Sequence, residues 1–388
     1  MDRRRLAVCL AGAAAFVPLY APQSLLPLLR HFAGPHSTMS AAMAGAVVSA
    51  GTAGVALAAP FVGRLGDRLG RHRVIVLAAF LAAIPSLLSA LAPTPALLVA
   101  ARLLEGLALP GIFAVTVAYT ADQWPPLEAR PVTALYVAGT IGGGFCGRLL
   151  SGLVAEFAGW RWAFAALAVL QLLLALLIRA WLAPDAPRPR PGHAAPVRFA
   201  ALFADPALRA IYAAGFALLF ALVAGFTYVS LHLAEPPFNL GPAGLSAIFI
   251  VYLLSMVTTP MSGRLLNRHG HARVLAMAWA AAIAGLLITL LPTLPAIITG
   301  LTLFSTGLFF AQTAATTFVG EAMPQARGAA VGLYVTCYYL GGSVGGVLPA
   351  PLWARFGWPG VIALITLAGA VSVTLGRRGF RQRRAAKA

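Results

Sequence analysis

The stretch "GRLGDRLGRHRV" occupies positions 63–74, and "GRLLNRHGHARV" occupies positions 263–274, 200 positions later. Seven of the twelve paired positions are identical, and Asp67 in the first copy is matched by Asn267 in the second. Each copy is an arginine-rich turn between two long apolar blocks. A turn that recurs together with its flanking blocks predicts a chain built from two similar halves.

The composition predicts a membrane protein. Of the 388 residues 60% are hydrophobic and only 10% are charged, whereas an average soluble domain is about one quarter charged. The net charge of +18 would suit nucleic acid only on a basic face with stacking aromatics. Here the arginines lie in short turns, so we expect no nucleic-acid partner. Cys9, Cys146 and Cys337 are far apart and show no disulfide or metal spacing, so we expect no metal and no cofactor.

The apolar blocks predict twelve membrane-spanning helices, because a helix needs about 20 residues to cross the hydrocarbon layer. The first block has the basic start of a cleaved signal peptide, but its apolar run continues to Leu29, so we expect it to be a span. The predicted spans lie near residues 6–29, 39–62, 74–92, 95–121, 131–156, 160–182, 207–233, 242–262, 273–291, 294–320, 327–353 and 357–376.

A Pro- and Arg-rich segment divides these spans into two sets of six. We predict an N-terminal six-helix bundle over 1–183, a cytoplasmic linker over 184–206 and a C-terminal six-helix bundle with a basic tail over 207–388. A second internal echo supports duplication: "ARPVTALYVAGTIGGG" (129–144) parallels "ARGAAVGLYVTCYYLGG" (326–342). The predicted fold class is all-α, with two pseudo-symmetric bundles of the kind found in transporters.

The arginines predict the orientation. One set of turns, together with both chain ends, holds 23 of the 28 basic residues, and the opposite set holds Arg30, Arg161 and Arg355. By the positive-inside rule both termini are therefore cytoplasmic. Only Arg102 and Arg148 fall inside predicted spans.

These motifs resemble the major facilitator superfamily of transporters. The turn "GRLGDRLGRHRV" is similar to the family signature between helices two and three, and the resemblance covers essentially the whole chain. "RLLEGLALPG" (102–111) resembles the fourth-helix signature of the drug:proton antiporter branch, and "GTIGGGFCGRLLSG" (139–152) its glycine-rich fifth-helix signature, without the usual Gly-Pro pair. The ending "GRLLSG" resembles bacterial inner-membrane efflux permeases, which implies a multi-pass protein of the bacterial cytoplasmic membrane.

The repeated turn is a candidate cytoplasmic gate. Glycines at 63 and 66 would allow close helix approach, and Gly70 would allow a sharp reversal. The resemblance implies that Asp67, Arg71 and Asp122 form a charge relay that locks the outward-facing state. The alternative is a turn that only sets topology, although arginines alone would suffice for that. The candidate gate residues are Gly63, Asp67, Arg68, Gly70, Arg71, Asp122 and Arg130.

Three ionisable residues inside the spans are candidates for the cavity, because such charges are costly in a membrane. Arg102 and Glu105 share a helix face, and Arg148 lies at a similar depth, roughly 10–15 Å below the outer surface at 1.5 Å per residue. We expect one Arg102–Glu105–Arg148 cluster with a charge of about +1, which favours anionic or zwitterionic cargo. Glu105 either carries the coupling proton or stays ionised and neutralises an arginine.

Polar-tipped aromatics and amides are further cavity candidates, with packing or an interfacial belt as the alternative for each. These residues are Tyr20, Gln23, Tyr119, Tyr136, Gln312 and Tyr338. Glycines at four-residue spacing predict flat faces for close helix packing, which would either let helices rock or only pack them. These positions are Gly139, Gly143, Gly147, Gly341 and Gly345.

The function predicted from the sequence is secondary transport of a small solute by alternating access. Proton-coupled export of a drug, sugar or metabolite comes first, and uptake by symport or facilitated diffusion second. A membrane-embedded enzyme is disfavoured, because the seven histidines fall in or near turns. A sensor without transport would not need a charged cavity. We expect a monomer in contact with lipid, whose partners are the solute and protons.

Overall fold

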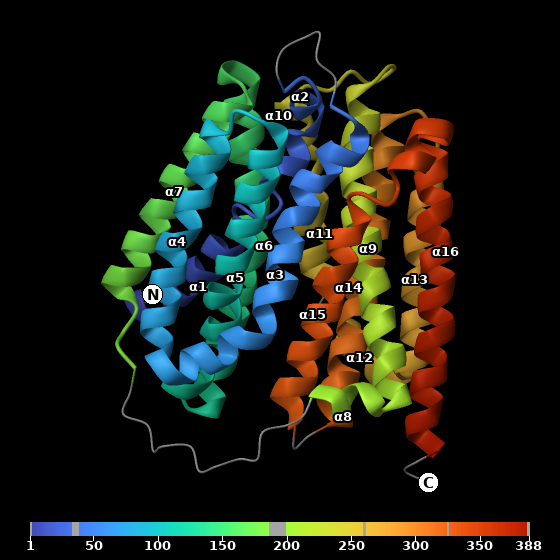
Figure 1. The fold of residues 1–388 in the computed structure, drawn as a ribbon. Helices are drawn as coiled ribbons and strands as arrows, with labels where there is room; N and C mark the ends of the chain where they lie inside the picture. Colours follow the sequence, from blue (N-terminus) through green and yellow to red (C-terminus); the bar gives the residue numbers. More distant parts are fainter. Residues whose placement is uncertain (1, 33–38, 186–198, 259–260, 324–325, 386–388) are drawn as a thin grey trace. The chain divides into compact units, whose positions relative to one another are not determined.

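The computed structural model describes residues 2–32, 39–185, 199–258, 261–323 and 326–385, and the regular structure within these ranges is helical throughout (Figure 1). The helices of the first part of the chain are α1 (Arg3–Phe16), the 3-10 turn η1 (Ala21–Ser24), α2 (Leu26–Arg30), α3 (Ala41–Leu69), α4 (Arg71–Leu91), α5 (Pro95–Gln123), α6 (Pro126–Ala158) and α7 (Trp160–Trp181). Those of the second part are α8 (Phe199–Ala204), α9 (Pro206–Ala234), α10 (Pro242–Ile248), α11 (Val251–Thr258), α12 (Met261–His269), α13 (His271–Ile288), α14 (Leu294–Ala322), α15 (Arg327–Gly345) and α16 (Ala350–Ala385).

Nine helices in these described ranges are long and apolar enough to cross a membrane. They are α3, α4, α5, α6, α7, α9, α13, α14 and α16. Of the other three predicted spans, two fall on interrupted helices, and the third falls on a helix that is long enough but less apolar. The first is divided into α1, η1 and α2, the eighth into α10, α11 and α12, and the eleventh contains the 19-residue α15. The count of twelve crossings and the cytoplasmic termini stay predictions.

Local sequence explains where the helices begin and turn. Ser40 and Thr94 accept hydrogen bonds from the backbone N–H three residues later, at 3.2 and 3.3 Å, and so cap α3 and α5. Asp205 caps α9 by accepting hydrogen bonds from the N–H groups two and three residues later, those of Ala207 at 2.8 Å and Leu208 at 3.3 Å. Gly70 and Gly270, at the two copies of the repeated turn, have φ of 89° and 75°. Both copies thus place glycine where other residues would be strained.

The chain forms two compact units, one within Met1–Ala194 with Leu240–Phe249, the other within Ala195–Asn239 and Ile250–Ala388. Residues 186–198 of the predicted linker lie outside the described residues, but α8 forms within 199–206, where the sequence indicated no helix. Its apolar "FAALFA" is the reason, since Phe203 packs on Tyr212 of α9 at 5.8 Å between ring centroids. Leu240–Phe249, which the sequence analysis placed in the second bundle, packs with the first unit.

Equivalent helices pair in the same way within each unit, as a duplicated chain predicts. In the first unit α1 packs on α6, α3 and α4 on α5, and α4 on α7 (Figure 1). In the second unit α9 packs on α15, α11 and α13 on α14, and α13 on α16. Small residues make these crossings close: a Cβ added at Gly106 of α5 would lie 2.0 Å from the Gly51 carbonyl oxygen of α3. Buried apolar side chains fill both units.

Candidate functional site

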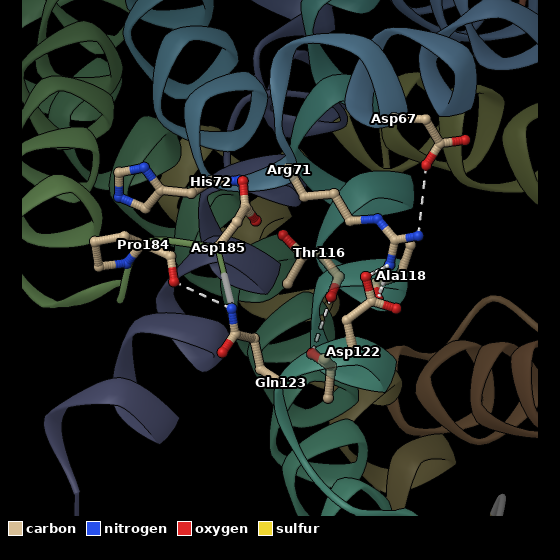
Figure 2. A network of polar contacts seen from close by, with 10 residues as sticks. Asp67, Arg71, His72, Thr116, Ala118, Asp122, Gln123, Pro184 and Asp185 are labelled. Carbon is tan, nitrogen blue, oxygen red and sulfur yellow. Dashed lines mark hydrogen bonds and ion pairs between the residues drawn. The ribbon is translucent and has the colours of Figure 1, made fainter. Parts of the chain in front are cut away.

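The turn between α3 and α4 brings three of the candidate gate residues together. Nη2 of Arg71 lies 3.5 Å from Oδ1 of Asp67, and its Nη1 lies 2.7 Å from Oδ2 of Asp122 (Figure 2). The same Nη1 donates a hydrogen bond to the carbonyl of Ala118. One guanidinium therefore joins the last turn of α3 to the last turns of α5.

A second set of contacts fastens the segment after α7 to this turn. Both carboxylate oxygens of Asp185 accept a hydrogen bond from the backbone N–H of His72, at 3.1 and 3.2 Å. Tyr119 donates its hydroxyl to the carbonyl of Ala183 at 2.8 Å. Gln123 donates to the carbonyl of Pro184 at 3.1 Å (Figure 2). Tyr119, a candidate for the cavity, thus takes part in the contacts at this turn.

The remaining gate candidates have different surroundings. Gly66 packs against the side chain of Val115 of α5, with 3.3 Å between a built Cβ and Cγ1. At Gly63 a Cβ would meet nothing within 4 Å among the described atoms, so the close helix approach expected there is not formed. Gly63 lies on the exposed face of α3, one turn before Gly66. Arg68 and Arg130 are exposed.

The first span is broken at Pro18. α1 ends at Phe16, and the chain resumes as a 3-10 turn only at Ala21. Proline has no N–H to donate and prevents a regular helix, so carbonyl groups around the break lose their helical partners. Backbone groups inside a membrane must be satisfied within the protein. The carbonyl groups at the break therefore need buried hydrogen-bond donors from elsewhere in the protein.

Arg102 supplies these donors. Its Nη2 donates to the carbonyls of Pro18 and Leu19 at 2.9 and 2.7 Å. Its Nη1 forms an ion pair with Glu105, which also accepts a hydrogen bond from Ser86 of α4. The side chains of Arg102 and Glu105 are both 0% exposed. The structure thus brings together the two members of the predicted cluster that lie on one helix face.

Arg148 lies on α6 and has a different set of partners. Its Nε and Nη2 both donate to the amide oxygen Oε1 of Gln23, at 3.2 and 2.8 Å, and its Nη1 donates to the carbonyl of Gly144 at 2.8 Å. The guanidinium carbon lies 5.1 Å from the ring centre of Tyr20 and 4.5 Å from that of Phe249. Arg148 is 4% exposed and Gln23 1%.

The backbone around Gln23 is fixed to α6 by two buried serines. The hydroxyls of Ser24 and Ser151 lie 3.1 Å apart, and both donate to the carbonyl of Ala21, at 3.0 and 3.2 Å. These hydrogen bonds therefore fix the position of η1, and with it Gln23, beside Arg148.

One face of α6 also holds the segment Leu240–Phe249. A carboxylate oxygen of Glu156 accepts the backbone N–H of Ala243 at 3.0 Å. One turn earlier, a Cβ on Gly152 would lie 2.5 Å from the Ser246 side chain, so the two backbones pack tightly. One further turn towards the start of α6, the guanidinium of Arg148 lies over the ring of Phe249. The spacing 148, 152, 156 is a single helix face.

The second unit contains an aromatic cluster with one amide. Tyr334 donates its hydroxyl to Oε1 of Gln312 at 2.7 Å and stacks on Tyr338 at 6.1 Å between ring centroids. Tyr252 packs on Phe309 at 5.8 Å. The candidates Gln312 and Tyr338 therefore share one cluster. In the first unit, Tyr136 donates to the carbonyl of Phe113 at 3.2 Å, with a mostly buried ring.

The glycine faces are packing faces. Built Cβ atoms at Gly139, Gly143 and Gly147 of α6 would lie 2.1, 2.5 and 2.0 Å from backbone atoms of α1 and of Val17 just after it. Those at Gly341 and Gly345 of α15 would lie 1.9 and 2.5 Å from backbone oxygens of α9. Only hydrogen fits at these positions. Rocking of the helices along these faces stays a prediction.

Four residues of this site were not among the candidates predicted from the sequence. Phe249 and Ser86 carry no polar or ionic signal that separates them from other span residues. Asp185 does carry one, since it is an acid at the start of an arginine-rich linker. Pro18, in the middle of the first predicted span, marked the break, and a proline in a span is a recognised pointer to a site.

These features define a multi-pass membrane protein with two duplicated helical units and buried ions within its spans. Residues 6–346 match the sequence profile described as Major Facilitator Superfamily. The chain is 33% identical to the "Inner membrane transport protein YnfM" of Escherichia coli over 385 residues, 98% of this chain and 91% of that one. It is 30% identical to the "Gentisate transporter" of Corynebacterium glutamicum over 175 residues, 43% of this chain and 39% of that one.

Among solved structures, that of a mutant of the nucleoside transporter NupG superposes with a TM-score of 0.75 at 17% identity, covering 97% of this chain and 99% of that one. At this identity the likeness concerns the fold. The chain belongs to the Major Facilitator Superfamily, and membrane transport is its function.

Proposed function

We propose that the protein is a proton-coupled secondary transporter that exports a small organic solute from a bacterial cell across the cytoplasmic membrane, as a monomer. The contact of Glu105 with Arg102 carries this proposal. A fully buried carboxylate in a span is a default candidate for proton transfer. Its partner Arg102 also holds the broken backbone at Pro18 and Leu19. The export direction rests on the similarity of 102–111 and 139–152 to antiporter signatures.

The coupling step follows from the same contacts. When Glu105 takes up a proton it loses its charge, and the ion pair with Arg102 is lost. Arg102 is then held by its hydrogen bonds to the carbonyls of Pro18 and Leu19. The chain after these residues forms η1, which contains Gln23. Protonation would thus alter the backbone that leads directly to the partner of Arg148. Glu105, Arg102 and the break form one continuous chain of contacts, which supports coupling between them.

The test is Glu105→Gln in proteoliposomes. We expect the variant to bind solute and to exchange it down its gradient, but to lose accumulation driven by a pH gradient. Glu128→Gln is the matched control, because Glu128 is an exposed carboxylate in a surface ion pair with Arg5. Accumulation that is unchanged in Glu105→Gln would leave Glu105 as a permanently ionised neutraliser of Arg102. Inverting the pH gradient in the same vesicles separates export from symport, because an antiporter moves solute against the proton flow and a symporter moves it with that flow.

We also propose that Asp67, Arg71 and Asp122 form the cytoplasmic gate. The ion pairs at 3.5 and 2.7 Å support this role. Such a pair must break and re-form when a gate works, and the partial exposure of Arg71 and Asp122 keeps the energetic cost of breaking it low.

The small organic nature of the solute is supported by the name of the gentisate transporter, a relative over part of the chain.

A further inference from the structure

Two interrupted spans meet at one buried arginine. Gln23 lies in η1, which follows the break at Pro18, and Phe249 lies between the end of α10 and the start of α11. Both contact the guanidinium of Arg148. Transporters commonly build their solute sites where helices are discontinuous.

The two buried arginines of the first unit are not equivalent. Arg102 is bound to a carboxylate, Glu105, and to two carbonyls of the break. Arg148 is bound to the uncharged amide of Gln23 and to a carbonyl, and two aromatic rings lie over it. Arg102 is thus paired with a carboxylate of the chain, whereas the Nε and Nη2 groups of Arg148 hold a neutral amide oxygen, which a carboxylate ligand can replace.

The bond to Gln23 has the form of a carboxylate contact. One oxygen bridges Nε and Nη2, which is the edge of the guanidinium that a carboxylate takes in its two-bond geometry. A charged acceptor binds roughly twice as strongly as a neutral one. A carboxylate brought to this edge would displace the amide of Gln23.

The rings of Tyr20 and Phe249 give the site a second preference. Their centres lie 5.1 and 4.5 Å from the guanidinium carbon, within the range of a cation–π contact. A planar ring attached to the carboxylate would stack on or replace one of them. Phe249 lies at the end of a segment that α6 grips at Gly152 and Glu156, so the ring is held over Arg148.

We infer that Arg148 anchors the carboxylate of an aromatic cargo, with Gln23 occupying its place when cargo is absent. This inference rests on the proposed transport function and names the chemical class of its solute. Arg148, Gln23, Tyr20 and Phe249 form the site.

Binding to the purified full-length protein tests it, by titration calorimetry at neutral pH. The probes are benzoate and naphthoate, with benzamide as the uncharged match and cyclohexanecarboxylate as the non-aromatic match. We expect both aromatic acids to bind and benzamide to bind about tenfold more weakly or not at all. Cyclohexanecarboxylate should lie between them, because it keeps the charge and loses the ring.

Three variants assign the binding to the site. Arg148→Lys removes the paired N–H donors of the guanidinium and should weaken the affinity for benzoate by about tenfold or more. Gln23→Glu puts a carboxylate of the chain itself on Arg148 and should abolish benzoate binding without unfolding, whereas loss by misfolding would lower thermal stability. Phe249→Leu should narrow the preference for benzoate over cyclohexanecarboxylate. Arg161→Lys is the control, because Arg161 also lies over aromatic rings and donates to carbonyls, yet away from this site.

The outcomes are distinguishable from failure of the transport function. If the wild type binds none of the aromatic acids, or if Arg148→Lys and Gln23→Glu bind them normally, the carboxylate site is overturned. A pH-driven flux of some other solute through the Arg148→Lys variant would then show that transport stands without it. If benzoate binds through Arg148 but no solute is ever moved, the site stands and the transport proposal fails.

Discussion

Asp185 caps the start of α4 from outside that helix: its two carboxylate oxygens lie 3.1 and 3.2 Å from the backbone nitrogen of His72. The first N–H groups of a helix have no partners within it, and a carboxylate there is also favoured by the helix dipole. Since Arg71 is the residue before His72, the segment after α7 fixes the backbone that carries Arg71, a residue of the proposed gate.

Replacement of Asp185 should therefore loosen this end of α4. We expect Asp185→Ala to cost about 1 kcal/mol of stability, as for other lost helix caps, with a smaller cost for Asp185→Asn, which keeps an oxygen acceptor. Thermal unfolding of the purified protein measures the difference. Equal melting of all three proteins would show that the contact contributes nothing.

Gly70 is the second requirement of the same turn. Its φ of 89° strains any residue with a side chain, and a Cβ would lie 2.6 Å from Oδ2 of Asp185. We expect Gly70→Ala to destabilise by roughly 1–2 kcal/mol. Gly63→Ala is the control, since a Cβ there meets open space and alanine is favoured inside a helix by about 0.5–1 kcal/mol. The two substitutions should shift thermal stability in opposite directions, and a shift in the same direction would contradict this account.

Sequence patterns predicted the parts of this structure that depend on period and spacing. Apolar blocks indicated the spans, and the three-residue spacing of Arg102 and Glu105 predicted that they share a helix face, where the structure pairs them. Position along a helix gives depth but not the direction a side chain faces across the bundle. For that reason the depth of Arg148 did not indicate its contacts with Gln23, Tyr20 and Phe249, and the cluster with Glu105 stays a prediction.

Features that depend on the path of the backbone were harder to predict. The contact of Asp185 with His72 joins residues 113 positions apart, and it depends on where the chain runs after α7. The family resemblance, by contrast, named Asp67, Arg71 and Asp122 before the structure brought them together. Gly63 is part of the same motif, yet its surroundings are open. A motif thus identifies residues without saying which of them pack.

The gate proposal makes a prediction that a purely topological turn does not. Asp67→Asn keeps every arginine of the turn and so keeps the orientation, but weakens the pair with Arg71. We expect a clear fall in the rate of solute flux with unchanged insertion, measured in proteoliposomes and by accessibility labelling of the termini. Arg64→Gln, which alters an exposed charge of the same turn, should leave the flux near wild type. Normal flux in Asp67→Asn would reduce the turn to a topological signal.

The buried pair on α5 should be asymmetric in its effect on stability. Arg102→Met leaves the Glu105 carboxylate buried and removes the donors to the broken first span, so we expect a loss of about 3–5 kcal/mol or failure to fold. Glu105→Gln leaves Arg102 on its two carbonyls and keeps an acceptor for Ser86, so its loss should be smaller. Denaturation of both variants and of the double variant gives the coupling between them. Equal effects of the two single substitutions would show that the carbonyl contacts are unimportant.

Neighbouring glycines on α6 provide a sharp test of the packing face. A Cβ at Gly147 would lie 2.0 Å from the carbonyl oxygen of Val17, which is backbone and has little room to move. A Cβ at Gly142 would meet nothing within 4 Å among the described atoms. We expect Gly147→Ala to destabilise by about 1–3 kcal/mol, the usual cost of overpacking, and Gly142→Ala to be neutral or stabilising. Because Val17 precedes the break that carries Gln23, Gly147→Ala should also weaken benzoate binding, while Gly142→Ala should not. Thermal unfolding and calorimetry of the pair measure both effects, and equal behaviour of the two variants would mean that α1 and α6 are not packed as closely as this face requires.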